Sequence, residues 1–170
     1  MGYVQIFAYS YLKALNSFFM SKPLILVTND DGVNAPGIRT LISVMKEIGD
    51  VFVVAPDSPQ SGMGHAITIN NTLELKHIPN FLGTNNAYSC SGTPVDCVKM
   101  AVREILKRKP DLCVSGINHG SNSSINVIYS GTMSAAVEAG IEGIPAIGFS
   151  HLDYSWETNL EPTKEWIKKI

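Results

Sequence analysis

Two adjacent carboxylates follow an apolar run near the start of the sequence. The stretch "ILVTNDDG" (residues 25–32) places Asp30 and Asp31 directly after residues typical of a buried strand. Consecutive strand residues point to opposite faces, so both acids can serve one site only if the chain turns, which Gly32 permits. Two carboxylates brought together need a proton, a cation or full solvation. With oxygen ligands and no nearby Cys or His cluster, Mg²⁺ or Mn²⁺ fits best, and a solvated turn with an Asp helix cap is the alternative.

Two later loops offer neutral oxygen ligands for the same ion. Ser61, in "DSPQSGMGH", carries a hydroxyl, and Asn118, in "SGINHGSN", carries an amide oxygen. Each residue is also compatible with an ordinary turn. Together with Asp30 and Asp31 they would form a site of oxygen ligands that leaves positions open for water and substrate.

The string "YSGT" (129–132) predicts a second clamp of a different kind. It opens an expected helix, where backbone N–H groups at 131–133, the hydroxyls of Ser130 and Thr132, and the helix dipole would make a phosphate cradle. Plain N-capping by either hydroxyl is the alternative interpretation. Opposite a metal site, the cradle would hold the same phosphate from its other side.

The alternation of apolar runs and helical periodicity predicts how these loops are positioned. It favours an α/β fold, a Rossmann-like doubly wound and mostly parallel sheet with helices on both faces. Strands are expected at 23–28, 51–56, 111–116 and 145–150, helices at 38–48, 94–109 and 132–140, a further helix within 159–170, and an edge hairpin from 66–69 and 73–78. Ligands bind beyond the carboxyl ends of such strands, where the polar loops would meet.

Composition limits the classes of partner. The chain has 170 residues, 45% of them hydrophobic and 16% charged, with a net charge of −2. That balance suits one α/β domain and gives no footprint for a nucleic-acid polymer or a membrane surface. Cys90, Cys97 and Cys113 form no CxxC pair, so we expect reduced, mostly buried thiols in a cytoplasmic protein.

Residues 1–21 are expected to be an N-terminal extension, and 22–170 the domain itself. The first 19 residues are apolar and aromatic, but they lack a basic n-region and a small-x-small cleavage site, and Lys13 and Asn16 interrupt them. A signal peptide and a membrane span are therefore disfavoured, and Ile6 breaks the myristoylation pattern.

Four blocks of this sequence resemble the SurE (survival protein E) family of metal-dependent nucleotidases. They are "ILVTNDDGVNAPGIRTL", "VVAPDSPQSGMGHAIT", "CSGTPVDCV" and "SGINHGSN…VIYSGTMSAAVEAG", in the family's order over about residues 22–150. The resemblance implies hydrolysis of nucleoside monophosphates with a divalent cation. By matching positions it implies Asp30, Asp31, Ser61 and Asn118 as metal ligands and Asn122, Ser130, Gly131 and Thr132 as phosphate contacts, with Asn34 and Gly62 as further candidates in the same loops.

The expected chemistry is metal-assisted hydrolysis by water. Asp30, or else Asp31, would position or deprotonate the water for in-line attack, and the cradle at 130–132 would stabilise charge on the equatorial oxygens. A covalent aspartyl-phosphate is the competing chemistry. His65 and His119 are interpreted as bystanders beside the site, and His77 and His151 as surface residues, while the cysteines stay outside the mechanism.

The chain departs from the family pattern in two places. Ser123, Ser124, Ile125 and Asn126 stand where many members carry a glycine and acidic residues, which would alter substrate shape. Family chains also continue into a hairpin and tail that exchange between subunits. We therefore expect the C-terminal part of the family fold to be missing, and a homodimer or homotetramer only where that part is present.

Three functions compete at this point. The leading one is a 5′-nucleotidase, with 3′-nucleotidase or exopolyphosphatase activity as an addition. The second is a truncated, non-catalytic nucleotide- or metal-binding member of the same family. The third is an unrelated aspartate-nucleophile phosphatase, which is disfavoured because it wants a DxD pair and "NDDG" does not supply one.

Overall fold

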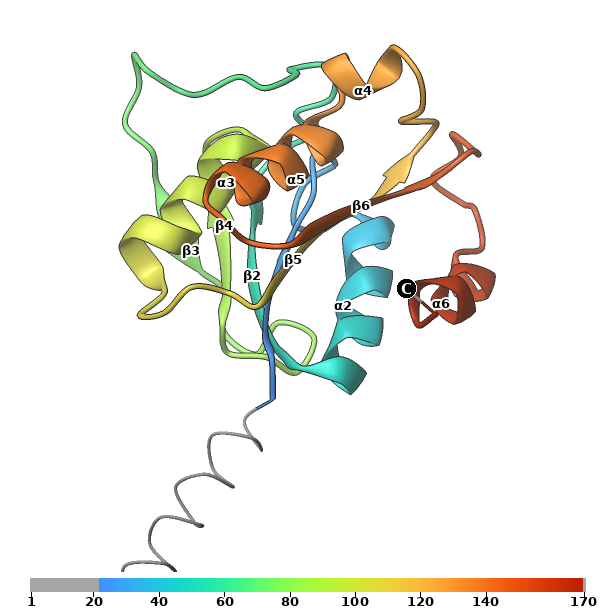
Figure 1. The fold of residues 1–170 in the computed structure, drawn as a ribbon, viewed down its shortest axis with the longest axis horizontal. Helices are drawn as coiled ribbons and strands as arrows, with labels where there is room; N and C mark the ends of the chain where they lie inside the picture. Colours follow the sequence, from blue (N-terminus) through green and yellow to red (C-terminus); the bar gives the residue numbers. More distant parts are fainter. Residues whose placement is uncertain (1–21, 170) are drawn as a thin grey trace, which may run out of the picture.

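A computed structural model describes residues 22–169, so the expectations for residues 1–19 lie outside the described part. Six strands form one sheet in the order β3-β4-β2-β1-β5-β6 (Figure 1). Every neighbouring pair is parallel except β3 with β4. The strands are β1 (Leu24–Thr28), β2 (Asp50–Pro56), β3 (Leu75–His77), β4 (Ala87–Cys90), β5 (Leu112–His119) and β6 (Ala146–His151). The predicted Rossmann-like, mostly parallel sheet is confirmed.

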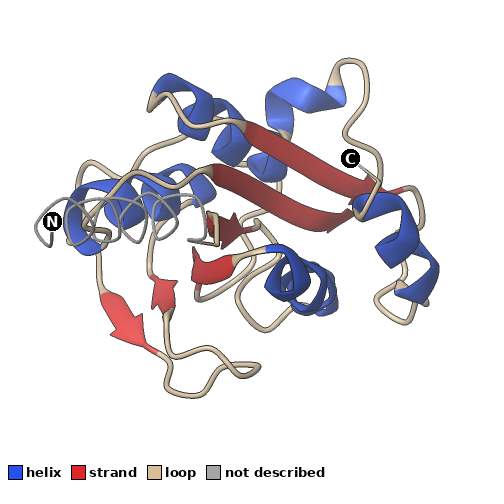
Figure 2. Cartoon of the chain, turned by 60° about the horizontal axis from the view of Figure 1, so that its bottom comes forward, coloured by secondary structure: helices blue, strands red, loops and turns tan. Residues whose placement is uncertain are grey.

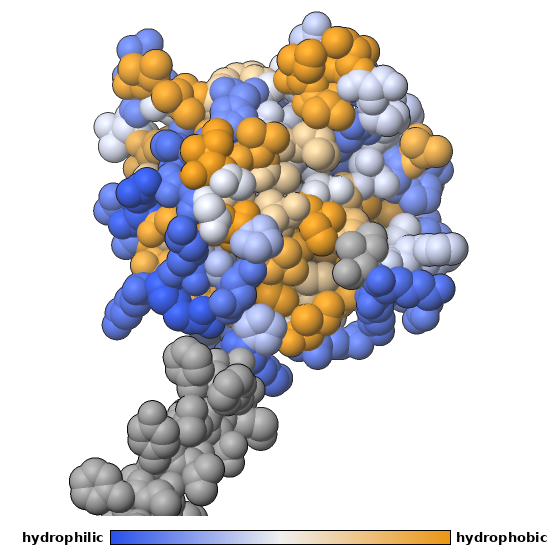
Figure 3. All heavy atoms as spheres, in the orientation of Figure 1, coloured by the Kyte–Doolittle hydropathy of each residue, from blue (hydrophilic) through white to orange (hydrophobic). Residues whose placement is uncertain are grey.

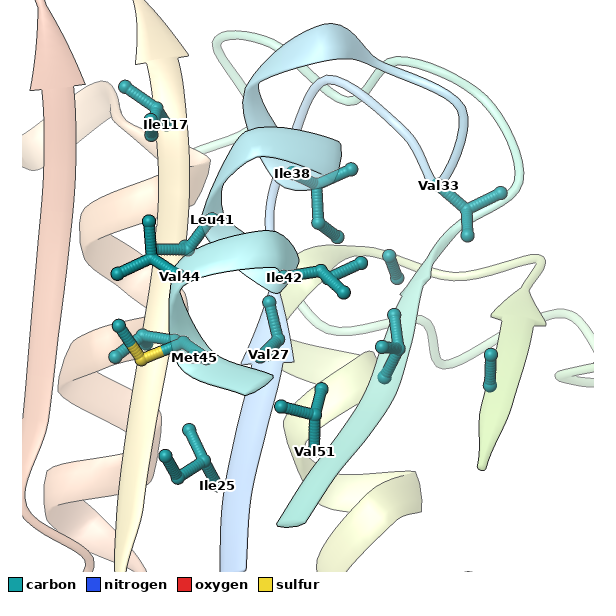
Figure 4. Packing of buried hydrophobic residues seen from close by; sticks show 14 of the residues in the cluster. Ile25, Val27, Val33, Ile38, Leu41, Ile42, Val44, Met45, Val51 and Ile117 are labelled. Carbon is teal, nitrogen blue, oxygen red and sulfur yellow. The ribbon is translucent and has the colours of Figure 1, made fainter. Parts of the chain in front are cut away.

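Helices cover both faces of this sheet, as the doubly wound pattern predicted (Figure 2). They are α2 (Pro36–Ile48), α3 (Pro94–Met100) with a π-helical turn η1 (Ala101–Ile105), α4 (Asn126–Tyr129), α5 (Gly131–Ile141) and α6 (Glu161–Ile167). Alternate residues of β1 divide the core: Ile25 and Val27 pack with α2, as Figure 4 shows, whereas Leu26 packs with α3 and α5. Burial on both faces explains why the central strands are continuous apolar runs.

Capping interactions mark the helix ends at two places. The α2 helix stops before Gly49, whose N–H donates to the carbonyl of Met45. A capping box starts α3, because Thr93 and Asp96 satisfy each other's backbone N–H groups. The predicted continuation to residue 109 is wrong: the helix widens into η1 and ends at Ile105, because the backbone is extended at Leu106.

The predicted edge hairpin is also wrong in its first arm. Residues 66–69 form no strand, and β3 pairs instead with β4, which was not predicted. Asp96 draws the first arm away from the sheet, since its carboxylate accepts hydrogen bonds from the backbone N–H and hydroxyl of Thr68. A long-range contact at the start of α3 therefore outweighs local strand propensity.

The segment between the expected strand at 111–116 and the expected helix at 132–140 contains further regular structure. The β5 strand continues to His119, with a break in register against β6 between Ser115 and Asn118. Such irregularities re-aim side chains at the end of a strand. The α4 helix then crosses the top of the molecule, where Figure 3 shows a hydrophobic area. The exposed large side chains in and just before this helix are Ile125, Val127, Ile128 and Tyr129.

The state of the cysteines and the length of the helices relate to the expected cellular location of the protein. Cys90, Cys97 and Cys113 are all free and buried. Burial raises the pKa of the Cys113 thiol to about 12, so this thiol stays protonated and unreactive at neutral pH. Among residues 22–169, no helix is long and apolar enough to cross a membrane.

Candidate metal and phosphate site

A pocket of about 250 Å³ opens beyond the carboxyl ends of β1 and β5. Three of the predicted metal ligands line it, namely Asp30, Ser61 and Asn118. Of the predicted phosphate-side residues, Asn122, Ser130 and Gly62 line it as well. Loops from distant parts of the sequence therefore meet where the rule for open parallel sheets expects a ligand.

Asp30 is almost fully buried at the base of this pocket, with 3% of its surface exposed. Its Oδ1 accepts a hydrogen bond of 2.5 Å from the hydroxyl of Thr132. Burial raises the pKa of Asp30 and the neighbouring Asp31 carboxylate raises it further, against the hydrogen bonds of Thr132, which lower it. Asp30 is therefore a carboxylate whose charge lacks full compensation from the protein.

Gly131 allows Asp30 to sit this deeply. A Cβ at position 131 would lie 2.6 Å from the Cβ of Asp30, closer than real contacts allow. The first turn of α5 thus packs directly against the carboxylate. A glycine is needed at position 131 because of this close approach to Asp30, and not because of its backbone conformation.

Asp31 is buried beside Asp30 but does not line the pocket itself. Gly32 has a φ of +96°, so the chain turns here as predicted. Asn29 steadies the turn by donating from Nδ2 to the carbonyl of Gly32. Oδ2 of Asp31 lies 3.0 Å from Nδ1 of His119, which does line the pocket.

Asn118 is oriented by two hydrogen bonds from the same amide nitrogen. Its Nδ2 donates to the carbonyl of Gly120 (3.0 Å) and to Oδ1 of Asn122 (3.1 Å). The amide oxygen of Asn118 is left available for a cation. Nδ2 of Asn122 is buried and has no hydrogen-bond partner within the described residues, so it is a free donor at the pocket wall.

The loop that carries Ser61 is exposed at its tip and anchored at both sides. The N–H of Gln60 donates to the carbonyl of Asp30 (2.7 Å), and the N–H of Gly64 donates to the carbonyl of Tyr129 (3.1 Å). These bonds anchor the loop in a position where Ser61 lines the same pocket as Asp30.

The two hydroxyl groups of the string "YSGT" have different partners in the structure. Ser130 caps α5, since its Oγ accepts from the N–H of Met133 at 3.0 Å, as the N-capping alternative expected. Ser130 also lines the pocket, whereas the Thr132 hydroxyl is engaged with Asp30. Asn34 is exposed and does not line the pocket, so the geometry does not bring it to the other candidates.

Comparison with known proteins identifies the family. The model of the family described as "Survival protein SurE" matches residues 25–170. The chain belongs to the SurE family. It is 77% identical over 151 residues to the "5′-nucleotidase SurE" of Flavobacterium psychrophilum, covering 89% of this chain and 59% of that protein. It is 78% identical over 149 residues to the protein of the same name from Flavobacterium johnsoniae, covering 88% and 58%.

A solved SurE structure supports the same assignment. The crystal structure of the SurE protein from Aquifex aeolicus matches with a TM-score of 0.75 and 41% identity, covering 86% of this chain and 59% of that chain. The chain thus spans somewhat less than three-fifths of the length of these SurE relatives.

The structure gives His119 and His65 defined contacts, while their expected role as bystanders in the reaction stays a prediction. The His119 side chain is 6% exposed, contacts Asp31, and stacks on Trp156 with ring centroids 4.5 Å apart. His65 contacts the buried Glu138, with Nε2 2.9 Å from Oε2. The sequence holds one signal that was missed for His119, which is its place directly after the candidate ligand Asn118. Trp156 and Glu138 carry no such local signal.

A divalent cation fits the residues that the SurE pocket contains. Asp30 and Asp31 are buried and adjacent, and within residues 22–169 no Lys or Arg pairs with either carboxylate, although His119 contacts Asp31. The hydrogen bonds of the Asn118 amide are made by its nitrogen. Within residues 22–169, three or more His, Cys, Asp or Glu do not gather into a metal-binding group. The candidate donors in and beside the pocket are carboxylate, hydroxyl and amide oxygens, the kind that Mg²⁺ and Mn²⁺ prefer and that soft metals do not.

Proposed function

We propose that this chain is a metal-dependent phosphatase that hydrolyses nucleoside monophosphates to nucleoside and phosphate. The observation that carries the proposal is the meeting of Asp30, Ser61 and Asn118 in one pocket that also contains Asn122 and Ser130. The names of the SurE relatives support a 5′-nucleotidase. Because the chain spans 59% of the first of these relatives, their whole-protein activity is a proposal for it.

We assign Asp30, Asp31, Ser61 and Asn118 as the ligands of Mg²⁺ or Mn²⁺. When bound, such an ion supplies charge stabilisation at the phosphoryl oxygen and an acidified water. Asp30 accepts a proton from the attacking water, a role that suits a carboxylate whose pKa burial has raised. Thr132 holds the Asp30 carboxylate in one orientation through its hydroxyl.

The opposite wall of the pocket binds the phosphate. Asn122 donates from Nδ2, the buried nitrogen that has no partner among the described residues. The Ser130 hydroxyl and the first turn of α5 place further dipoles beside it. Gly131 and Thr132 serve this wall through the backbone, since the Thr132 side chain is committed to Asp30.

Exposed aromatic side chains at the rim of the same pocket offer a surface on which the nucleoside can bind. Tyr129 and Tyr154 both line it and are 60% and 70% exposed. Exposed aromatic faces next to a phosphate site suit a substrate with a flat base. The choice between 5′- and 3′-nucleotides and the cleavage of short polyphosphate stay predictions.

A non-catalytic member that binds nucleotide or metal is the alternative. Phosphate release from a panel of nucleoside monophosphates, with Mg²⁺ or Mn²⁺ and again with a chelator, separates the two. We expect turnover that the chelator and Asp31→Asn both abolish, while Asp57→Asn, in an exposed loop after β2, retains it. Activity surviving both treatments would exclude the metal mechanism, and metal binding without turnover would favour the alternative.

The cellular location and the oligomeric state of the protein are also proposals. A cytoplasmic location is proposed because the three cysteines are free, which suits a reducing compartment. The homodimer or homotetramer also stays a prediction, and sedimentation of the purified chain tests it.

A further inference from the structure

We propose that His119 is a positioning residue for Asp31, and that Trp156 holds His119 in place. The inference rests on the proposed function, because it takes Asp31 to be a metal ligand. It concerns a residue that the resemblance to the family did not single out. Three contacts carry it: one at the Nδ1 edge of the imidazole, one on the face of its ring, and one between the loop of His119 and the segment that carries Trp156.

The first contact fixes one oxygen of Asp31. Nδ1 of His119 lies 3.0 Å from Oδ2 of Asp31, and each side chain is 6% exposed. A carboxylate oxygen only accepts hydrogen bonds, so the ring hydrogen sits on Nδ1 and donates to Asp31. Within the described residues Oδ1 of Asp31 receives no side-chain hydrogen bond. The contact with His119 therefore occupies Oδ2 and leaves Oδ1 available to bind a cation.

The second contact fixes the imidazole. The rings of His119 and Trp156 stack with centroids 4.5 Å apart and planes 30° apart. Nε2 of His119 is buried without a hydrogen-bond partner in the described part of the chain. The ring is therefore held by Asp31 at one edge and by the indole face, and not by a second polar anchor.

The third contact fixes the segment that carries Trp156. The N–H of Gly120 donates to the carbonyl of His151 at 2.7 Å. A Cβ on Gly120 would lie 2.2 Å from the ring of Tyr154, so this ring rests on the glycine backbone. Residues 151–156 thus pack against the 118–122 loop, and from this segment Trp156 stacks on His119.

An oriented carboxylate binds a cation more tightly than a mobile one, because no rotational freedom is lost on binding. Removing an outer hydrogen-bond partner of a metal ligand costs about 10- to 100-fold in metal affinity. This effect appears in equilibrium binding and needs no turnover. It can therefore be measured separately from the proposed activity.

The test is the dissociation constant for Mn²⁺, measured by electron paramagnetic resonance of the free ion without nucleotide. An asparagine at position 119 would place its amide nitrogen near the position that Nδ1 of His119 occupies. A glutamine there would place its amide nitrogen near the position of Nε2. We expect His119→Leu and His119→Gln to weaken Mn²⁺ binding about 10- to 100-fold and His119→Asn to bind close to the wild type. Trp156→Phe should retain binding and Trp156→Ala should weaken it.

Matched controls lie elsewhere in the chain. His77→Leu removes a histidine that packs on Tyr88 with centroids 5.1 Å apart at the sheet edge, and Trp166→Ala removes an exposed indole on α6. Both should leave Mn²⁺ binding unchanged. The proposal is overturned if His119→Gln binds like His119→Asn, or if both match the wild type while Asp31→Asn loses binding. If the wild type itself binds no Mn²⁺, the proposed function fails instead. Should His119→Leu not fold, the Asn and Gln pair still decides.

Discussion

The hydroxyl of Thr132 donates a hydrogen bond of 2.5 Å to Oδ1 of Asp30, joining residues 102 positions apart in the sequence. Both side chains are buried. The bond connects the end of β1 with the first turn of α5, so the candidate metal site is anchored to the core of the sheet. Its geometry therefore depends on helix packing as much as on the loops.

Thr132→Val should destabilise the protein and impair the site. Valine keeps the shape of threonine but leaves Oδ1 of Asp30 without its donor, which costs about 1–3 kcal/mol for a buried polar group. Urea unfolding in a chelator measures the loss, and Mn²⁺ titration measures the effect on the site. Thr132→Ser keeps the hydroxyl and should retain most of both properties. A loss in the Ser variant with none in the Val variant would show that the methyl group matters and the hydrogen bond does not.

Two glycines on α5 should respond oppositely to alanine. Gly131→Ala places a Cβ 2.6 Å from that of Asp30, so the carboxylate must move and metal binding and phosphate release should fall at least about 10-fold. Gly140→Ala meets nothing within 4 Å and should stabilise the helix by about 0.5–1 kcal/mol. Kinetics and thermal unfolding of both variants check this pair. An active Gly131→Ala protein would contradict the close packing on Asp30.

Asn122→Ala should weaken substrate binding. Its unpartnered Nδ2 is assigned to the phosphate, and a hydrogen bond to a charged group contributes about 1.5–3 kcal/mol, so kcat/KM should fall about 10- to 100-fold. Inhibition by inorganic phosphate should weaken in parallel. The exposed Asn71→Ala variant, in the loop before β3, serves as the control. Unchanged phosphate inhibition in Asn122→Ala would remove this residue from the phosphate wall.

The buried Glu138 should make stability depend on acid pH. It accepts hydrogen bonds from Lys99 (2.8 Å) and His65 (2.9 Å), which bridges α5 to α3 and to the Ser61 loop. Burial acts to raise the pKa of Glu138, but the hydrogen bonds and charges of Lys99 and His65 outweigh it and lower the pKa below its usual 4.5. A lowered carboxyl pKa stabilises the folded state above the unfolded pKa. That contribution is lost as pH falls below about 4.5 and through the folded-state value.

Glu138→Gln should therefore cost about 1–3 kcal/mol at pH 7, and its difference from the wild type should shrink below pH 4.5. Urea unfolding at a series of pH values measures this. Glu142→Gln is the matched control, because Glu142 pairs with the exposed Arg103 and such pairs contribute under about 1 kcal/mol. A constant difference across the pH range would show that packing, and not charge, makes Glu138 matter.

Short-range signals explain the parts of the fold that the sequence predicted well. Continuous apolar runs identify the central strands, and the Thr93–Asp96 capping box marks a helix start within four residues. The hairpin prediction was wrong because β-pairing is decided between segments. Residues 66–69 had strand propensity, yet Asp96 holds Thr68 through contacts 28 positions away. Local propensity carries no information about such a competitor.

For the candidate site, too, the sequence predicts some features and the tertiary structure decides others. The sequence by itself determined which side chains are candidates for the chemistry, because Asp30, Asp31, Ser61 and Asn118 sit in polar loops after apolar strands, and the topology rule for parallel sheets places those loops together. Only the tertiary structure decided how they are oriented. Thr132 turns out to hold Asp30, and His119 contacts Asp31 across 88 positions while stacking on Trp156. Side-chain orientation depends on partners that no local pattern specifies, since they meet only when the sheet and its covering helices have packed.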